Sequence, residues 1–186
     1  MGARTSTRRP PTRLPILQPP KGFSVTTSAK PHIVFVCTGN ICRSPMAEVI
    51  VRAAVEDAGM ADAVEISSCG IGGWHSGQQA DRRARAELAA HGYDGESHRA
   101  QQLNSALIDA DLLIALDDGH IDDLLSQGAA EERIRLLRSF DPDSAPGAIV
   151  EDPYYGGSEG FSITRRQIEA ATPGIVDWVR HATSLS

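Results

Sequence analysis

Apolar and polar positions along the chain fall into blocks that predict strands and helices in alternation. Residues 33–37 and 112–116 are unbroken apolar runs, which are typical of strands buried on both faces of a sheet. Residues 45–60 instead carry apolar side chains at helical spacing. The whole pattern predicts strands at 33–37, near 63–68, at 112–116 and at 134–137, and helices at 45–60, 80–91, 118–126 and over a last segment with Phe161, Ile168, Ile175 and Val179 on one stripe. This alternation indicates an α/β domain, a parallel sheet of four strands with helices on both faces.

The first predicted strand runs directly into a loop whose composition suits an anion. The loop extends from Cys37 to Arg43, and Ser44-Pro45 resembles a helix N-cap followed by proline at the first helical position. Backbone N–H groups at the start of a helix have no helical partner, and the helix dipole adds partial positive charge there. We therefore expect phosphate to be bound by Thr38, Gly39, Asn40, Ile41, Cys42 and Ser44.

Cys37 and Arg43 supply the reactive groups of this loop. Arg43 is the sixth residue after Cys37, so a loop curled around a tetrahedral anion brings the guanidinium over the sulfur, where it can bind two oxygens. The helix N-terminus and the cation both favour the thiolate, which is the nucleophilic form of Cys37. Ser44 is expected to donate a hydrogen bond to that sulfur. Gly39 and Asn40 tolerate the positive φ angles of a tight loop.

The three cysteines of the chain also raise the alternative of a zinc site. The Gly-Asn pair between Cys37 and Cys42, and the adjoining Arg43, suit an anion better than a cation. Cys69 lies in an apolar stretch and is expected to be a buried structural residue. Cys42 is either a small core residue or a partner that traps oxidised Cys37 as a disulfide, which would make the site redox-sensitive. A reactive thiol favours a reducing compartment, so we expect a cytoplasmic protein, with secretion without a signal peptide left open.

Phosphate-ester hydrolysis by a thiolate needs a separate acid to protonate the leaving oxygen and then to activate water. Asp152 lies in a Gly/Pro/Tyr-rich segment, residues 151–157, which is typical of a surface loop able to overhang a site. Asp141 precedes a proline in the same way. The local residues alone do not separate these two aspartates.

The loop and several later motifs resemble the low molecular weight protein tyrosine phosphatases, whose signature is Cys-x5-Arg-Ser after an apolar strand. Further matches to the family's order and spacing are Ser68-Cys69-Gly70, Gly73-Trp74-His75, His98-Arg99-Ala100, Ala115-Leu116-Asp117 and Asp152-Pro153-Tyr154-Tyr155. The resemblance covers residues 31 to about 182. It is greatest to the actinobacterial members, in keeping with sixteen arginines against two lysines.

The resemblance implies strand order 2-1-3-4 and hydrolysis of a phosphotyrosine protein through a phospho-cysteine intermediate, with no metal and no other cofactor. It assigns the acid to Asp152, because the family's acid is the aspartate of Asp-Pro-Tyr. Ser68 and His98 are expected to support the loop, His98 by steadying Asn40. The implied substrate cleft is lined by Trp74, His75, Tyr154 and Tyr155.

Several alternatives stay open at this point. Arsenate reductases share the implied fold, but the thioredoxin-coupled type uses two further cysteines, and none follows Cys69, which leaves a reductase using an external thiol. In phosphoarginine phosphatases a threonine stands where this chain has Ile41, and isoleucine favours tyrosine. A phosphotyrosine-binding module without turnover is disfavoured because thiol, arginine and acid are all present. Trp74 could instead be a buried core residue.

Composition and charge separate an N-terminal extension, residues 1–30, from a phosphatase-like domain at 31–186. The first thirty residues hold six basic and no acidic side chains together with five prolines, so we expect them to be disordered. The remaining residues hold 12 basic and 24 acidic side chains. We expect no nucleic-acid partner, although a basic arm that touches anionic lipid or nucleic acid stays an alternative. No apolar run approaches a membrane span or the core of a signal peptide.

Overall fold

The computed structural model describes residues 30–184. The predicted extension at 1–30, with the lipid or nucleic-acid contacts considered for it, therefore lies outside the described residues except for Lys30. The described residues form a four-stranded parallel sheet in the order β2-β1-β3-β4. This confirms the predicted α/β class and the strand order implied by the resemblance.

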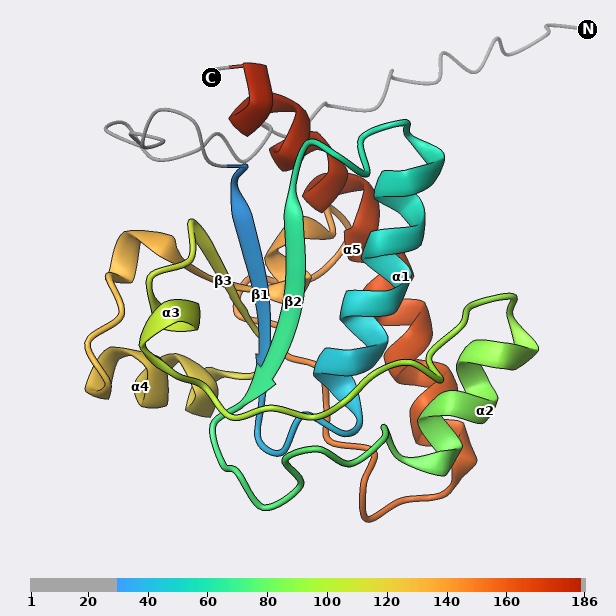
Figure 1. Ribbon diagram of the computed structural model, residues 1–186. Helices are drawn as coiled ribbons and strands as arrows, with labels where there is room; N and C mark the ends of the chain where they lie inside the picture. Colours follow the sequence, from blue (N-terminus) through green and yellow to red (C-terminus); the bar gives the residue numbers. More distant parts are fainter. Residues whose placement is uncertain (1–29, 185–186) are drawn as a thin grey trace, which may run out of the picture.

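The elements follow one another as strand and helix in turn (Figure 1). The strands are β1 (His32–Cys37), β2 (Glu65–Gly70), β3 (Leu112–Ala115) and β4 (Ile134–Leu136). The helices are α1 (Arg43–Asp57), α2 (Arg82–Ala90), α3 (Ser105–Ile108), α4 (Asp118–Ser126) and α5 (Ser158–Ser184), with 3-10 turns η1 (Glu131–Arg133) and η2 (Leu137–Phe140).

Alternate residues of β1 point to opposite faces of the sheet, and each face has its own apolar core. Ile33 and Phe35 belong to a core shared with α1, α2 and α5. Val34 and Val36 belong to a second core shared with α3 and α4. Figure 1 shows these two groups of helices on either side of the sheet. All four side chains are fully buried, which explains why this run contains no polar residue.

Some predicted boundaries were wrong, and the start of α1 is the most informative case. The helix begins at Arg43, its N-cap residue is Cys42, and no side chain caps it. Ser44 was predicted to be the cap, but its hydroxyl is fully buried and interacts with Cys37 and Asn40 instead. The second strand lies two residues later than predicted, and the four-residue α3, capped by Asn104, was not predicted.

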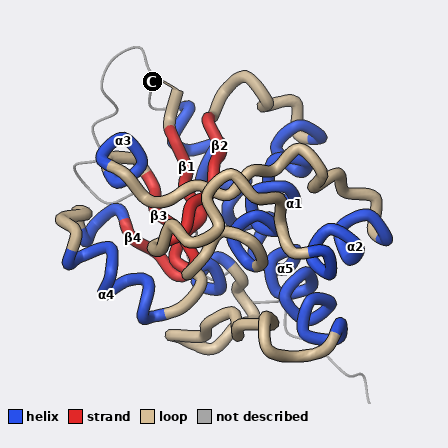
Figure 2. The backbone as a smooth tube through the Cα atoms, turned by 60° about the horizontal axis from the view of Figure 1, so that its bottom comes forward, coloured by secondary structure: helices blue, strands red, loops and turns tan. Residues whose placement is uncertain are grey.

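Loops that are distant in the sequence meet at the carboxyl edge of the sheet, where parallel α/β sheets bind ligands. The backbone N–H groups of Ile71 and Gly72, which follow β2, donate to the carbonyls of Cys37 and Thr38 at 2.9 Å. Figure 2, with this edge turned forward, shows the loops gathered there. Among residues 30–184, no helix combines the length and the apolar character that a bilayer span would need.

Candidate active site

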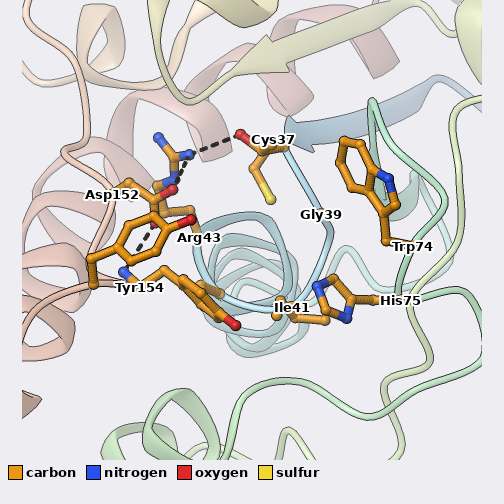
Figure 3. Close-up of a pocket in the computed structure, with 11 residues that line it drawn as sticks. Cys37, Gly39, Ile41, Arg43, Trp74, His75, Asp152 and Tyr154 are labelled. Carbon is orange, nitrogen blue, oxygen red and sulfur yellow. Dashed lines mark hydrogen bonds and ion pairs between the residues drawn. The ribbon is translucent and has the colours of Figure 1, made fainter.

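A cavity of about 340 Å³ opens at the carboxyl edge of the sheet. Figure 3 shows the Cys37 sulfur facing into it, with Arg43, Asp152 and Tyr154 on one side and Trp74 on the other. Each lining residue had been predicted for the site: Cys37, Thr38, Gly39, Ile41, Cys42, Arg43, Trp74, His75, Asp152, Tyr154 and Tyr155. The structure therefore brings together residues that the sequence separates by more than a hundred positions.

The phosphate loop, residues 37–43, surrounds the Cys37 sulfur with hydrogen-bond donors. The backbone N–H of Asn40 points at Sγ from 3.3 Å. The Ser44 hydroxyl lies 2.9 Å from the same sulfur and receives a hydrogen bond from the Asn40 side-chain amide at 2.8 Å. The Asn40 amide occupies a lone pair of the Ser44 oxygen, and the hydroxyl hydrogen can be donated to this sulfur or to the Cys69 carbonyl at 3.3 Å. The sulfur thus lies within hydrogen-bond distance of the Asn40 N–H and the Ser44 hydroxyl.

Asn40 holds the loop in its curled shape. Its φ of 57° is the only positive φ among the non-glycine residues that the structure describes, and asparagine tolerates this conformation better than most residues. The side-chain amide also donates to Ser68 at 2.8 Å, and the side-chain oxygen accepts from the backbone N–H of Gln101 at 2.8 Å. His98 Nε2 lies 3.0 Å from the Asn40 carbonyl oxygen. The turn is thus fixed by contacts from two other parts of the chain, β2 and the segment 98–101.

Glu48, on α1, lies beneath this network and does not belong to the predicted site. Its carboxylate accepts from Ser68 and Arg52 and lies 3.7 Å from His98 Nδ1. Burial alone would raise the pKa of Glu48, but the hydrogen bonds from His98, Ser68 and Arg52 outweigh burial and lower it. A buried negative charge therefore supports the phosphate loop from behind.

Arg43 reaches across the cavity from the first turn of α1 and is 3% exposed. Nη1 donates to Asp117 at 2.7 Å and to the carbonyl of Val150 at 3.1 Å. Nη2 donates to Asp152 at 3.1 Å and to Thr38 Oγ1 at 3.3 Å. The guanidinium is therefore oriented by two carboxylates, and its Nη2 edge faces the cavity together with Asp152.

Asp117, which the sequence placed at the same sheet edge as the loop, and His120, which it missed, form a second support for the phosphate loop. The two residues close a reciprocal capping box at the start of α4, in which His120 Nδ1 accepts from the Asp117 backbone N–H at 3.2 Å. Burial, aided by the nearby Arg43 charge and opposed by Asp117, lowers the pKa of His120. A neutral ring that accepts at Nδ1 carries its proton on Nε2, which therefore donates to Thr38 Oγ1 at 3.0 Å.

The acid loop, residues 151–157, carries Asp152 to the rim of the cavity. Its Oδ1 accepts from the Tyr154 backbone N–H at 3.1 Å, and its Oδ2 faces Arg43. Within residues 30–184, the Asp141 carboxylate accepts only from the backbone N–H of Asp143 in a local turn, and Asp141 does not line the cavity. The geometry separates the two aspartates that local sequence left equivalent.

Aromatic side chains stand at the mouth of the cavity on both sides. Trp74 is 73% exposed, so the alternative of a buried core tryptophan is wrong. Tyr154 and Tyr155 contact each other edge to face with ring centroids 5.0 Å apart. The imidazole of His75 lies over Gly39, where a Cβ would come within 3.1 Å of it, so a larger residue there would require the imidazole to shift.

The three cysteines are free and buried. Cys37 and Cys42 belong to one core and Cys69 belongs to the core on the opposite face of the sheet, so the three thiols do not share one site as zinc ligands would. Burial, with the Asp81 charge adding to it, raises the pKa of Cys42, and burial raises the pKa of Cys69 to about 12. Among residues 30–184, no three His, Cys, Asp or Glu side chains form a group that could hold a metal ion.

Comparison with known proteins agrees with this geometry. The family described as low molecular weight phosphotyrosine protein phosphatase matches residues 32–184. The low molecular weight protein-tyrosine phosphatase A of Mycobacterium tuberculosis is 50% identical over 149 residues, which cover 80% of this chain and 91% of that protein. A low molecular weight protein-tyrosine-phosphatase of Streptomyces coelicolor is 50% identical over 154 residues, covering 80% and 93%.

The fold also matches that of solved phosphatase structures. The crystal structure of a protein tyrosine phosphatase from Entamoeba histolytica matches with a TM-score of 0.76 at 28% identity, covering 82% of this chain and 99% of that one. The motifs, the cavity and these relatives lead to one assignment: this chain belongs to the low molecular weight phosphotyrosine protein phosphatase family.

Proposed function

We propose that this protein is a phosphotyrosine protein phosphatase that works through a phospho-cysteine intermediate. The observation that carries the proposal is the Arg43 guanidinium, which faces the cavity beside the Cys37 sulfur and is bonded to Asp152 at 3.1 Å. Nucleophile, anion clamp and acid thus share one cavity, which is the combination that a two-step displacement at phosphorus needs.

In the first step the Cys37 thiolate attacks phosphorus opposite the leaving oxygen. The S–P bond forms as the P–O bond to the phenol breaks, and Asp152 transfers its proton to the departing oxygen. Arg43 and the loop N–H groups bind the phosphoryl oxygens, on which charge develops in the transition state. We expect bound phosphate to compete with Asp152 for Nη2 of Arg43, because both accept hydrogen bonds from the same edge of the guanidinium.

In the second step Asp152, now ionised, takes a proton from a water molecule that attacks the phospho-cysteine. The P–O bond to this water forms as the S–P bond breaks, which restores the thiolate and releases inorganic phosphate. The Ser44 hydroxyl, 2.9 Å from Sγ, is placed to stabilise the departing thiolate by donating its hydrogen. Over the two steps Asp152 gives one proton to the phenol and regains one from water, and neither step uses a metal or another cofactor.

The walls of the cavity favour an aryl phosphate on a protein. Trp74 and Tyr155 are exposed at its mouth, where they can stack on a phenyl ring and contact flanking peptide. Ile41 lines the cavity with an apolar side chain, whereas phosphoarginine phosphatases have threonine there. Arsenate reduction would draw on an external thiol, because the two other cysteines are buried. Free thiols also suit the cytoplasmic location that we expect.

The proposal is tested by following phosphate release from phosphotyrosine, phosphoserine and phosphoarginine peptides, and arsenate reduction with added thiol. We expect turnover of the phosphotyrosine peptide at a kcat/KM at least about 100-fold above that of the others, a difference of about 2.7 kcal/mol in transition-state binding. Faster turnover of phosphoarginine or of arsenate would overturn it.

The nucleophile is tested with Cys37→Ser. This variant should lose hydrolysis while it still binds inorganic phosphate, because Arg43 and the loop N–H groups remain. Retention of one hundredth of the wild-type kcat, a loss of only about 2.7 kcal/mol, would be too much activity for thiolate catalysis. Cys69→Ser is the matched control, since Cys69 lies away from the cavity wall, and it should stay active.

A further inference from the structure

Arg83, near the start of α2, does not line the cavity, yet it connects the two loops that do. Its guanidinium pairs with both oxygens of Asp81, at 3.0 Å through Nε and 2.9 Å through Nη2. The Asp81 backbone N–H in turn donates to the carbonyl of Ile41 in the phosphate loop at 2.7 Å. Arg83 is therefore anchored on the phosphate-loop side of the site.

The remaining donors of Arg83 point at the acid loop. Nη1 donates to the carbonyl of Gly156 at 2.9 Å, and Nη2 donates to the carbonyl of Tyr154 at 3.0 Å. The guanidinium carbon also lies 4.7 Å from the centroid of the Phe161 ring on α5 and 5.8 Å from that of the Tyr154 ring. A planar donor fork close to two rings is held more rigidly than a flexible ammonium would be.

The acid loop has few other attachments. Within the described chain, the other hydrogen bonds of residues 153–157 are local: Tyr154 to Asp152, Gly156 to Pro153, and Gly160 to Gly157. Asp152 itself is held from outside the loop by Arg43. We expect a bound phosphate to compete with Asp152 for Arg43, which would leave the two bonds from Arg83 and the packing of the buried Pro153 to locate the loop.

We propose that Arg83 is a positioning residue, which sets the height of the acid loop over the phosphate loop and so presents Asp152 to the leaving oxygen. The inference rests on the proposed phosphatase activity. Arg83 touches neither the phosphate nor the phenol, and it acts through the backbone of Tyr154 and Gly156. Removing it should therefore weaken proton transfer and leave phosphate binding intact.

The test compares Arg83→Met, Arg83→Lys and the matched control Arg82→Met. Arg82 is exposed and makes no hydrogen bond or ion pair within residues 30–184. For each variant, kcat is measured with phenyl phosphate and p-nitrophenyl phosphate, whose leaving groups need an acid to very different degrees. The inhibition constant of inorganic phosphate and the melting temperature are measured alongside.

We expect Arg83→Met to lower kcat for phenyl phosphate by about 10- to 100-fold, the cost of a misplaced catalytic group, and that for p-nitrophenyl phosphate by less than about threefold. Phosphate inhibition should stay within about twofold of wild type. Lysine should restore only part of the loss, because it cannot pair with Asp81 and two carbonyls in one plane. Arg82→Met should match wild type.

The inference would be overturned if Arg83→Met lowered kcat equally for both substrates, or if it lowered the melting temperature and left the ratio of the two kcat values unchanged. Arg83 would then be a merely structural residue. If Arg83→Lys had the wild-type kcat for phenyl phosphate, the planar guanidinium would not be needed to position the acid loop. If the wild-type protein hydrolysed neither aryl phosphate, the proposed function itself would fail. That result differs from failure of this inference, in which wild type turns over both substrates.

Discussion

The two loops that close the cavity are held in opposite ways. The phosphate loop is buried and cross-linked: Asn40 is 0% exposed, and its side chain bonds to Ser44, to Ser68 and to the backbone of Gln101. The acid loop is exposed, with Tyr155 at 92%, and α2 holds it only at two carbonyls through one guanidinium. One loop is fixed by many short contacts and the other by few.

This difference matches what each loop is proposed to do. Donors aimed at a phosphoryl group stabilise the transition state best when they need no reorganisation, which favours a rigid phosphate loop. The acid has to protonate a bulky phenol in the first step and to activate a small water molecule in the second. A loop held by few contacts can shift between these two positions. We therefore expect changes in the phosphate loop to alter stability and activity together, and changes in the acid loop to alter activity alone.

Oxidation of the phosphate loop should have the largest effect, a complete but reversible loss of activity. Peroxide oxidises the Cys37 thiolate to a sulfenic acid, and attack by Cys42 on that sulfur forms a disulfide with release of water. The attacking group is the Cys42 thiolate, and burial raises the pKa of Cys42, so the disulfide should form faster as the pH rises. Mass spectrometry of the oxidised protein at two pH values measures this.

The controls for oxidation are the two other cysteines. Cys42→Ser should turn reversible inactivation into irreversible inactivation, whereas Cys69→Ser should stay protected because Cys69 lies in the other core. Recovery of only sulfinic or sulfonic acid at Cys37, with Cys42 free, would rule out the protective disulfide.

Asp152→Asn comes next and tests the acid loop. We expect kcat for phenyl phosphate to fall by about 10² to 10⁴, the usual range for general acid catalysis, and that for p-nitrophenyl phosphate to fall much less. The urea midpoint should hardly change, since Asp152 is about 41% exposed. A phenyl phosphate rate within about threefold of wild type would exclude Asp152 as the acid.

Asp141→Asn is the matched control, because it removes the same charge from the other Asp-Pro turn. It should leave the leaving-group dependence unchanged. If Asp141→Asn changed the leaving-group dependence of kcat and Asp152→Asn did not, Asp141 would be the acid.

Asn40→Ala should act on stability as well as on activity. Alanine loses the bonds to Ser44, Ser68 and Gln101 and disfavours the φ of 57°, so we expect the free energy of unfolding to drop by about 2–4 kcal/mol. Asn40→Gly removes the same bonds without the strain and should be less destabilising by about 1 kcal/mol. The acid-loop counterpart, Tyr155→Ala, should change stability by less than about 0.5 kcal/mol. Similar urea midpoints for Asn40→Ala and Tyr155→Ala would contradict the contrast between the loops.

The sequence predicted best what depends on local pattern. The apolar run at 33–37 and the alternation of strands and helices led to the correct sheet, because strands buried on both faces exclude polar residues. The cavity-lining residues were found because the loop motif is continuous and the later motifs follow the family's order. The structure also separates Asp152 from Asp141 in space, which no local feature of the two Asp-Pro pairs could do.

Features that depend on long-range partners were missed or misassigned. Ser44 has the residue type of an N-cap, but its hydroxyl faces a sulfur that lies seven positions earlier in the chain. Glu48 looks like a solvent-facing helix residue until β2 places Ser68 over it. Arg83 sits in a basic run that resembles a solvated helix face. Its place one turn after Ser44 on α1 was the one signal that could have drawn attention to Glu48.

The smallest expected effect concerns the charge beneath the phosphate loop. Hydrogen bonds lower the pKa of Glu48 in the folded state, so its contribution is fully present above the unfolded value, near 4.5, and is lost as the pH falls through the folded value. Glu48→Gln should therefore cost about 1–2 kcal/mol of unfolding free energy at pH 7, and the gap from wild type should narrow below about pH 4.5. Urea unfolding at pH 7 and pH 3.5 measures the change. Glu56→Gln changes an exposed residue on the same helix. Its free energy of unfolding should differ little from that of wild type at both pH values. A Glu48→Gln gap that stayed constant or widened on acidification would mean that this carboxylate does not stabilise the phosphate loop through its charge.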